Sequence, residues 1–149
     1  MWTGGVRIVI TNDDGKILFV KQKHEENEIW MLPGGTVEDN ETSQDAAIRE
    51  ALEETGLIIS VERLIWHVEE LSETKGQRFV NFFLGSIIGG KPELGEDPEL
   101  GENQVLEEIA FFSKEEVQKL ANVYPSALRD EIWEEITLEN CKNRYRIRK

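Results

Sequence analysis

The sequence has 149 residues, of which 39% are hydrophobic and 32% are charged, and its formal net charge at pH 7 is −13. This length and composition are typical of one folded domain rather than of a disordered segment, so we expect a single domain over residues 1–149. The negative charge disfavours general attraction to nucleic acids or to anionic lipids.

The sequence shows no pattern for export or membrane insertion. Its apolar runs are only a few residues long, whereas a spanning helix needs about 20. The start, MWTGGVRIVI, lacks the basic region and the long apolar block of a signal peptide. A single cysteine, Cys141, excludes an internal disulfide and a cysteine metal cluster. We therefore expect a cytoplasmic protein.

The first part of the chain predicts a hairpin, a short strand and a glycine turn. Val6–Thr11 is rich in β-branched residues, the NDDG sequence of Asn12–Gly15 is a turn signal, and Lys16–Lys21 is the return strand. A polar loop then leads to a short strand at Ile29–Leu32. Pro33-Gly34-Gly35 ends that strand and lets the backbone approach a ligand closely.

A helix is predicted to begin near Ser43 and to end at Gly56. The TSQD sequence of Thr42–Asp45 resembles a capping box with Asp in place of the usual Glu, and glycine is common just beyond a helix end. At about 100° per residue, the helix divides into two opposed arcs. The apolar arc holds Ile48, Ala51, Leu52 and Thr55, and the acidic arc holds Glu50, Glu53 and Glu54.

We expect the apolar arc of this helix to pack on a core and the acidic arc to face a cleft. Clustered carboxylates repel one another unless a cation lies among them. Hard divalent cations with oxygen ligands, above all Mg²⁺, suit such a cluster.

The rest of the chain predicts an extended hairpin and a long loop. Leu57–Leu71 and Arg78–Ile88 are the two strands, joined by a turn at Gly76. Gly89–Asn103 follows as a loop rich in glycine and acidic residues. Loops of this length without their own structure are often functional.

One strand and two helices are predicted after this loop. Gln104–Phe112 is the strand, and Ser113 with Glu116 forms an S-x-x-E cap for a short helix over Lys114–Leu120. After Pro125, SALRDEIWEEITLE predicts an amphipathic helix with its apolar residues inward, namely Leu128, Ile132, Trp133 and Ile136. The basic tail Lys142–Lys149 is interpreted as a solvated or loosely docked end, with guidance of a phosphorylated ligand or pairing with an acidic surface as the alternatives.

Gly35–Leu57 resembles the Nudix box, G-x5-E-x7-R-E-U-x-E-E-x-G-U, in which U is a bulky apolar residue. The matching positions are Gly35, Glu41, Arg49, Glu50, Glu53, Glu54, Gly56 and Leu57. The one departure is Ala51, a smaller apolar residue at a U position, and it leaves the chemical groups intact. The preceding WMLPGG and the order of the strands also look like this family.

The resemblance implies a Nudix fold, an α/β (α+β) structure in which a mixed β-sheet is sandwiched between α-helices. It also implies hydrolysis of a diphosphate linked to a nucleoside, with Mg²⁺ or Mn²⁺ as the cofactor, and a homodimer as the assembly. Glu41 would support the site, and Arg49 would orient the glutamates through salt bridges. The implied metal ligands are the Gly35 carbonyl, Glu50, Glu53 and Glu54.

The chemistry of a diphosphate agrees with these expectations. A diphosphate repels an attacking hydroxide, so hydrolysis needs charge neutralisation and an activated water, which a bound metal supplies. A carboxylate accepts the proton of the water. Family members use either a box glutamate, here Glu53, or a glutamate of a later loop, here Glu96, Glu99 or Glu102. We prefer Glu102 to Glu99 because it lies nearest the following strand.

Three functions stay open at this point. The leading one is metal-dependent hydrolysis of a small nucleotide: ADP-ribose, another sugar nucleotide, a nucleoside triphosphate or a dinucleoside polyphosphate. The second is a module that binds a nucleotide without cleaving it, which the intact box disfavours. The third is a pyrophosphohydrolase acting on RNA 5′ ends, which the negative charge disfavours. The substrate-binding residues are not predicted, and Trp30 is expected in the core rather than as a stacking platform.

Overall fold

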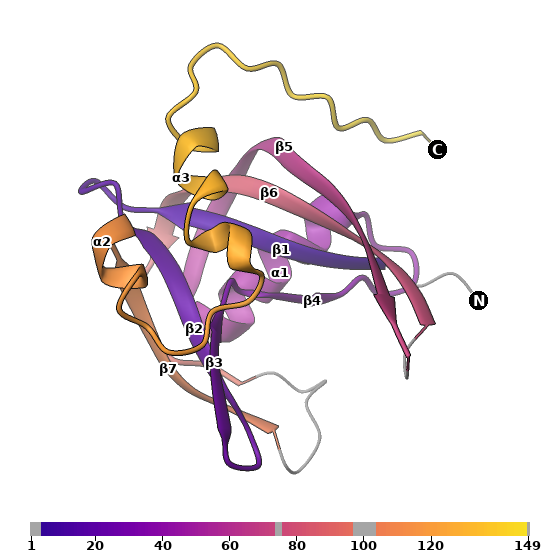
Figure 1. The fold of residues 1–149 in the computed structure, drawn as a ribbon. Helices are drawn as coiled ribbons and strands as arrows, with labels where there is room; N and C mark the ends of the chain where they lie inside the picture. The colour runs from indigo at the N-terminus through magenta and orange to yellow at the C-terminus, as the bar shows by residue number, and fades with distance from the viewer. Residues whose placement is uncertain (1–3, 74–75, 97–103, 149) are drawn as a thin grey trace.

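One mixed β-sheet with helices on both of its faces forms the framework of the chain (Figure 1). This computed structural model describes residues 4–73, 76–96 and 104–148. The elements follow in the order β1 (Gly4–Thr11), β2 (Ile17–His24), β3 (Asn27–Met31), β4 (Gly34–Thr36), α1 (Ser43–Thr55), β5 (Leu57–Ser72), β6 (Gly76–Gly90), β7 (Gln104–Phe112), α2 (Lys114–Val117), the 3-10 turn η1 (Ser126–Leu128) and α3 (Glu131–Glu135).

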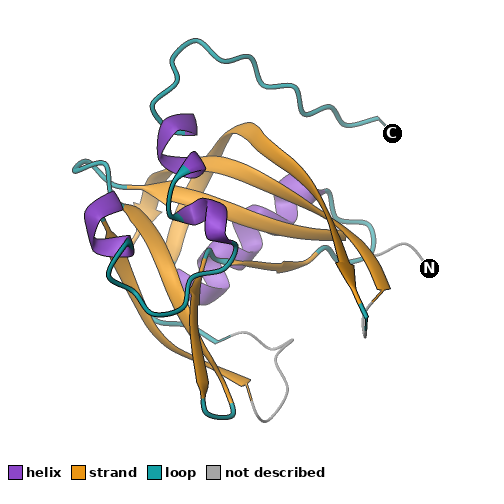
Figure 2. Cartoon of the chain, viewed as in Figure 1, coloured by secondary structure: helices purple, strands orange, loops and turns teal. Residues whose placement is uncertain are grey.

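The sheet contains both parallel and antiparallel pairs. Its main path has the order β3-β2-β1-β6-β5, while β4 pairs with β1 and β7 pairs with β2. The central pair, β1 with β6, is parallel and sets Val6 opposite Asn81. The pairs β1–β2, β1–β4, β2–β3, β2–β7 and β5–β6 are antiparallel. The predicted mixed sheet between helices is therefore confirmed (Figure 2).

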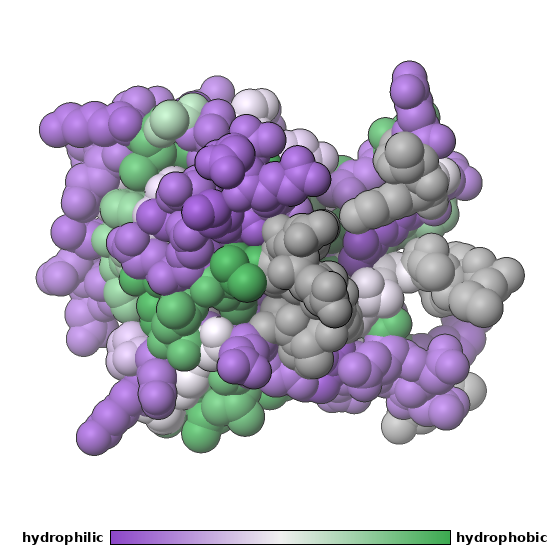
Figure 3. All heavy atoms as spheres, turned by 90° about the horizontal axis from the view of Figure 1, so that it is seen from below, coloured by the Kyte–Doolittle hydropathy of each residue, from purple (hydrophilic) through white to green (hydrophobic). Residues whose placement is uncertain are grey.

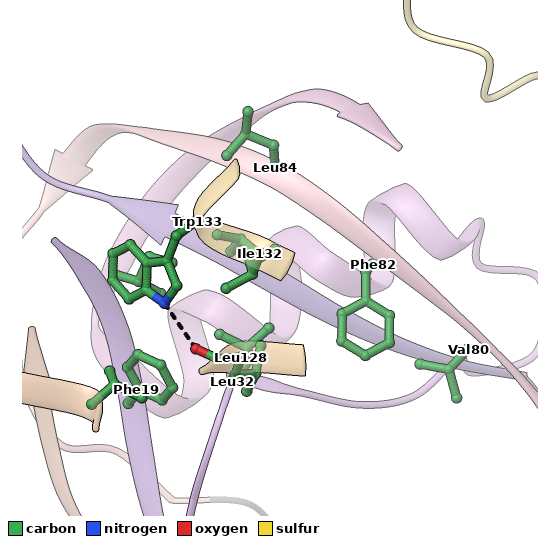
Figure 4. Packing of buried hydrophobic residues seen from close by; sticks show 11 residues of the cluster. Phe19, Leu32, Val80, Phe82, Leu84, Leu128, Ile132 and Trp133 are labelled. Atoms are coloured by element: carbon green, nitrogen blue, oxygen red, sulfur yellow. Dashed lines mark hydrogen bonds between the residues drawn. The ribbon is translucent and has the colours of Figure 1, made fainter. Parts of the chain in front are cut away.

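The two faces of the sheet carry separate hydrophobic cores, because successive residues of a strand point to opposite faces. In β6, Phe83 belongs to the core beneath α1, and its neighbour Phe82 belongs to the core beneath η1 and α3. Figure 4 shows this second core, where the indole Nε1 of Trp133 donates to the Leu128 carbonyl at 2.9 Å. The sheet is thus held between α1 and the C-terminal helices.

The predicted ends of α1 are confirmed. Thr42 is the N-cap and accepts from the Asp45 backbone N–H, and Gly56 is the left-handed C-cap with a φ of 74°. The prediction of its buried face is confirmed for Ala51 and Thr55, which are fully buried, and is wrong for Leu52 and for two of the acids. Leu52 is 51% exposed, whereas Glu50 and Glu54 are fully buried.

Small residues form much of the buried face of α1. Ala46, Ala47 and Ala51 are fully buried against the sheet. Three alanines allow the helix to lie close to the strands, and this orientation turns Glu50 and Glu54 toward Gly34 and Gly35 at the start of β4. Glu53 alone of the box acids on α1 keeps substantial exposure, with 34% of its side chain accessible.

The strands that the sequence predicts are present, and β4 is an addition. The chain at Gly34–Thr36, which overlaps the turn predicted at Pro33-Gly34-Gly35, pairs with Gly5–Arg7 of β1. The strand β6 continues to Gly90, so the predicted loop begins at Lys91 rather than at Gly89. Glu99 and Glu102, two of the candidate bases, lie outside the described residues.

The C-terminal part differs from the single amphipathic helix predicted after Pro125. The segment instead forms η1 and the short α3, separated by Arg129 and Asp130. Leu128, Ile132 and Trp133 are nevertheless buried as predicted, and Ile136 packs against the same core. Helix α2 has the predicted Ser113–Glu116 capping box but ends at Val117, earlier than expected.

The basic tail is docked near its middle. Tyr145 packs on Phe83 with ring centroids 5.0 Å apart, and the Asn143 Oδ1 accepts from the backbone N–H of Leu64. Cys141 is exposed. The underside of the molecule shows hydrophilic side chains around a hydrophobic patch (Figure 3). Among the helices in the described ranges, none has the length and apolar character needed to cross a bilayer.

Candidate active site

The glycine turn and α1 approach each other closely. The backbone N–H of Gly34 donates to Glu54 Oε2 at 2.7 Å. A β-carbon added to Gly35 would lie 2.5 Å from Glu50 Oε1, so the absence of a side chain makes room for this carboxylate. The sequence placed these residues in one motif, and the structure brings the turn and both buried carboxylates together.

Arg49 links the loop before α1 to the helix acids. Its Nε and Nη2 donate to the two oxygens of Glu41 at 2.8 and 3.0 Å, a bidentate pair. Its Nη1 donates to Glu50 Oε1 at 3.0 Å and to Glu53 Oε2 at 3.1 Å. The Nη2 also donates to the Thr36 carbonyl at 3.1 Å. One guanidinium therefore fixes three of the predicted site glutamates.

The charges of Arg49 and its glutamate partners shift each other's pKa values. The hydrogen bonds from Arg49 lower the pKa of Glu41 below its usual value of 4.5, and the backbone N–H of Glu38 adds to this effect. In turn, Glu41 and then Glu50 raise the pKa of Arg49. Because opposite charges stabilise each other's ionised forms, Glu41 is a carboxylate and Arg49 a cation at neutral pH.

The end of α1 is held by the segment that follows β6. The backbone N–H of Glu93 donates to the Thr55 carbonyl at 2.8 Å, and that of Gly95 donates to the Glu54 carbonyl at 2.9 Å. This contact brings the beginning of the acidic loop to the C-terminal end of α1, beside the box. Glu96, the candidate base that the structure describes, is exposed there.

Arg78 of β6 is a site residue that the sequence did not predict. Its Nη2 donates to the Gly35 carbonyl at 3.2 Å. A β-carbon on Gly5 of β1 would lie 2.6 Å from Arg78 Nε, so glycine is required for the guanidinium to cross that strand. No local pattern identifies Arg78, because its position follows from the pairing of β6 with β1.

A recess of about 470 Å³ lies beside the loop before α1. On its wall, the rings of His67 and Phe79 stack 5.5 Å apart, and His67 Nδ1 lies 2.6 Å from Asn81 Oδ1. The Nδ2 of Asn81 donates to the Ser43 hydroxyl at 2.9 Å, and Tyr145 of the tail closes one side. The sequence did not predict this recess, whose residues come from distant segments.

Trp30 occupies a structural position, as expected. It packs partly buried against the core of η1 and α3, and its ring meets that of Phe112 edge to face at 4.9 Å.

The oxygen atoms of the predicted metal ligands are of the kind that a hard divalent cation binds. Within residues 4–73, 76–96 and 104–148, no group of three His, Cys, Asp or Glu side chains is already arranged as a metal site. Nevertheless, the buried carboxylates of Glu50 and Glu54 flank the glycine turn, and all the groups concerned are oxygen donors of the kind that Mg²⁺ prefers. The metal-ligand roles of Gly35, Glu50, Glu53 and Glu54 stay predictions.

Known proteins resemble the chain over most of its length. A model of the NUDIX domain matches residues 1–130. A Bacillus subtilis (strain 168) protein, named provisionally as an 8-oxo-dGTP diphosphatase, is 37% identical over 91 residues, 61% of this chain and 58% of that protein. An ADP-ribose pyrophosphatase of Methanocaldococcus jannaschii is 32% identical over 123 residues, 81% of this chain and 68% of that protein.

The fold is also that of a solved protein. A NUDIX hydrolase from Nitrosomonas europaea superposes with a TM-score of 0.74 at 25% identity, over 91% of this chain and 88% of that one. The match to the Bacillus relative spans less than two thirds of that protein's length. Since the domain model covers most of the sequence and the box geometry is in place, the chain belongs to the Nudix family.

Proposed function

We propose that the chain hydrolyses a diphosphate bond in a nucleoside diphosphate derivative and depends on a divalent cation. The observation that carries this proposal is the joining of the glycine turn to the acids of α1. Gly34 holds Glu54, Gly35 leaves room for Glu50, and Arg49 ties Glu50 and Glu53 to the preceding loop. Buried carboxylates in such a cluster call for a cation.

Each box residue has a distinct part in the proposed reaction. The Gly35 carbonyl, Glu50, Glu53 and Glu54 would hold Mg²⁺ or Mn²⁺, which supplies charge neutralisation at the phosphoryl oxygens and an activated water when bound. Arg49 and Glu41 are positioning residues. Their bidentate pair fixes the guanidinium, and the guanidinium in turn fixes the carboxylates of Glu50 and Glu53.

Of the three box glutamates on α1, Glu53 is the one best suited to accept the proton of the attacking water, and the exposed Glu96 is a described alternative. Its side chain is 34% exposed, while Glu50 and Glu54 are fully buried. A base must reach both the water and, afterwards, the solvent. Glu102 of the acidic loop, outside the described residues, is another alternative, and Arg49 would act on the geometry rather than on the substrate.

Turnover of a small substrate panel with Mg²⁺ tests the proposal. The panel contains ADP-ribose, a second sugar nucleotide, 8-oxo-dGTP, a dinucleoside polyphosphate and a 5′-triphosphorylated RNA, read by phosphate or nucleotide release. ADP-ribose comes first, because a relative of that name matches over 81% of this chain. We expect cleavage of at least one small nucleotide at the diphosphate, abolished by EDTA.

The other outcomes of the panel separate the remaining functions. Measurable nucleotide affinity without release of any product would support the binding module and contradict hydrolysis. Turnover confined to RNA, and lost on deletion of residues 142–149, would assign the activity to RNA 5′ ends. No turnover and no binding would reject the proposed function.

A further inference from the structure

Arg7 of β1 lies beside the glycine turn of the box. It stands opposite Gly34 of β4 in the antiparallel pair. A β-carbon on Gly34 would lie 2.8 Å from Arg7 Cδ, so the absence of a side chain there makes room for the arginine. Because the backbone N–H of the same glycine donates to Glu54, a single residue separates Arg7 from a box carboxylate.

The guanidinium of Arg7 has donors to spare. Its Nη1 donates to the Leu32 carbonyl at 3.0 Å, and the residue is half-buried. A guanidinium carries five N–H donors. Within residues 4–73, 76–96 and 104–148, no carboxylate forms an ion pair with Arg7, whereas Arg49 pairs with several glutamates. A half-buried cation without a carboxylate is suited to an anion that comes from outside the protein.

Arg7 is also a neighbour of a large cavity. It lies two residues before Val9, whose side chain belongs to the core beneath η1 and α3, so Arg7 points to that face of the sheet. Its register partner on β6 is Phe82, which points to the same face (Figure 4). Phe82 lines a cavity of about 690 Å³ together with Trp66 and Tyr124. Arg7 therefore stands between the box and a cavity with aromatic walls.

A cation at this place answers the charge of the box. A diphosphate that enters beside the box meets the carboxylates of α1, which repel it. The guanidinium of Arg49 is already bound by Glu41, Glu50 and Glu53. A second planar guanidinium, able to form two parallel hydrogen bonds to phosphate oxygens, offsets the repulsion.

We propose that Arg7 is a substrate-binding residue, which keeps its bond to the Leu32 carbonyl and donates its remaining N–H groups to phosphoryl oxygens of the diphosphate. This inference rests on the proposed function and adds to it a residue outside the box. It assigns Arg7 to the binding of the substrate rather than of the cation, so that two separate measurements distinguish the roles.

The first test combines kinetics and metal binding in the variants Arg7→Gln and Arg7→Lys. With the best substrate of the panel, we expect KM of Arg7→Gln to rise about 10-fold or more, because charge-assisted hydrogen bonds are lost, while kcat changes little. Arg7→Lys should lie between Arg7→Gln and wild type, since it keeps the charge without the fork. Mn²⁺ affinity without substrate, measured by calorimetry, should equal that of wild type in both variants.

The second test needs no turnover. Methylenediphosphonate, a diphosphate analogue that cannot be hydrolysed, is titrated into each protein at a fixed excess of Mg²⁺ and followed by calorimetry. We expect wild type to bind it and Arg7→Gln to bind it about 10-fold more weakly or worse. Failure of the proposed function shows itself as no turnover by wild type, and this titration then still decides whether Arg7 binds a diphosphate.

Arg144→Gln is the matched control. Arg144 is an exposed residue of the tail, and the substitution removes the same charge from the molecule. Wild-type values are expected for KM and for both affinities. Thermal unfolding of all four proteins establishes that each is folded, and Arg7→Lys, which keeps a donor for the Leu32 carbonyl, carries the test if Arg7→Gln does not fold.

Two results would overturn the inference. One is an unchanged KM and an unchanged affinity for methylenediphosphonate in a folded Arg7 variant, which shows that Arg7 does not touch the diphosphate. The other is a loss of Mn²⁺ affinity with KM unchanged. In that case Arg7 only holds the Leu32 carbonyl and, through it, the position of the glycine turn.

Discussion

At the scale of single residues, Arg49 explains how carboxylates persist on a buried helix face. Burial of charge is costly unless hydrogen bonds and an opposite charge compensate it. Arg49 gives this compensation to Glu50, and the Gly34 backbone N–H gives it to Glu54. The sequence predicted the acids and the arginine from their spacing, but it placed the acids on an open face because an amphipathic pattern treats carboxylates as exposed.

The pair between Glu41 and Arg49 makes stability depend on pH. Because the folded-state pKa of Glu41 is lowered, its contribution is fully present above the ordinary value of 4.5 and is lost as the pH falls through the lower folded value. At pH 7, we expect Glu41→Gln to unfold with a free energy about 2 kcal/mol below that of wild type.

Urea unfolding of both proteins from pH 7 to pH 3 measures this difference. It should shrink steadily below pH of about 4.5, since protonation removes the same charge from the wild-type protein. A difference that stays constant down to pH 3 would show that the charge of Glu41 does not stabilise the fold.

Gly35 is the second residue with a sharp structural requirement. An alanine there would set its β-carbon 2.5 Å from Glu50 Oε1 and displace the carboxylate. We expect Gly35→Ala to weaken Mn²⁺ binding by about 10-fold or more, and to cost about 1–3 kcal/mol in stability. Gly89→Ala is the control, because its β-carbon would meet Ile58 at an ordinary 3.5 Å. Equal Mn²⁺ affinities in Gly35→Ala and wild type would contradict this account.

At the scale of elements, the sequence predicts what local chemistry decides. The ends of α1 follow from Thr42 and Gly56, the cap of α2 follows from Ser113 and Glu116, and the hairpin strands follow from turns and β-branched runs. The predictions that failed concern features that contacts between separate elements decide. Strand β4 exists because β1 offers a free edge to the glycine turn, and the sheet selects the alanine face of α1.

The division of the C-terminal helix has a similar origin. The apolar residues after Pro125 have helical spacing, which predicted one helix. In the structure, the Arg129 guanidinium donates to the carbonyls of Val117 and Leu120, and the Asp130 side chain caps α3. These contacts link the division between η1 and α3 to α2. Helix α2 lies outside the segment over which the helical spacing of apolar residues was read.

The N-cap of α1 gives a direct test at this scale. The Thr42 hydroxyl accepts from the backbone N–H of Asp45 at 3.0 Å. We expect Thr42→Ala to lower the free energy of unfolding by about 1 kcal/mol and Thr42→Ser to retain it, because serine keeps the hydroxyl. Denaturant titration of the three proteins decides the matter, and an alanine variant as stable as wild type would show that this cap contributes nothing.

At the scale of the whole molecule, the sheet brings together site residues from distant segments, which the sequence alone did not predict to be neighbours. The box itself was predictable, since its residues lie within one short segment. Arg78 and the recess of His67, Phe79 and Asn81 come from β5 and β6, and the pairing of β6 with β1 helps to bring these residues beside the box. The sequence therefore predicted the family and the reaction class but not the substrate.

The most direct test of the central claim is the rate of diphosphate hydrolysis by Glu54→Gln at saturating Mg²⁺. Glutamine keeps an oxygen for the Gly34 backbone N–H, so we expect the variant to fold while it lacks one negative charge of the box. We expect kcat to fall by about three powers of ten or more. Glu62→Gln, at an exposed position of β5, should match wild type. A wild-type rate in Glu54→Gln, or hydrolysis undiminished by EDTA, would contradict the claim that the box carboxylates hold a catalytic cation.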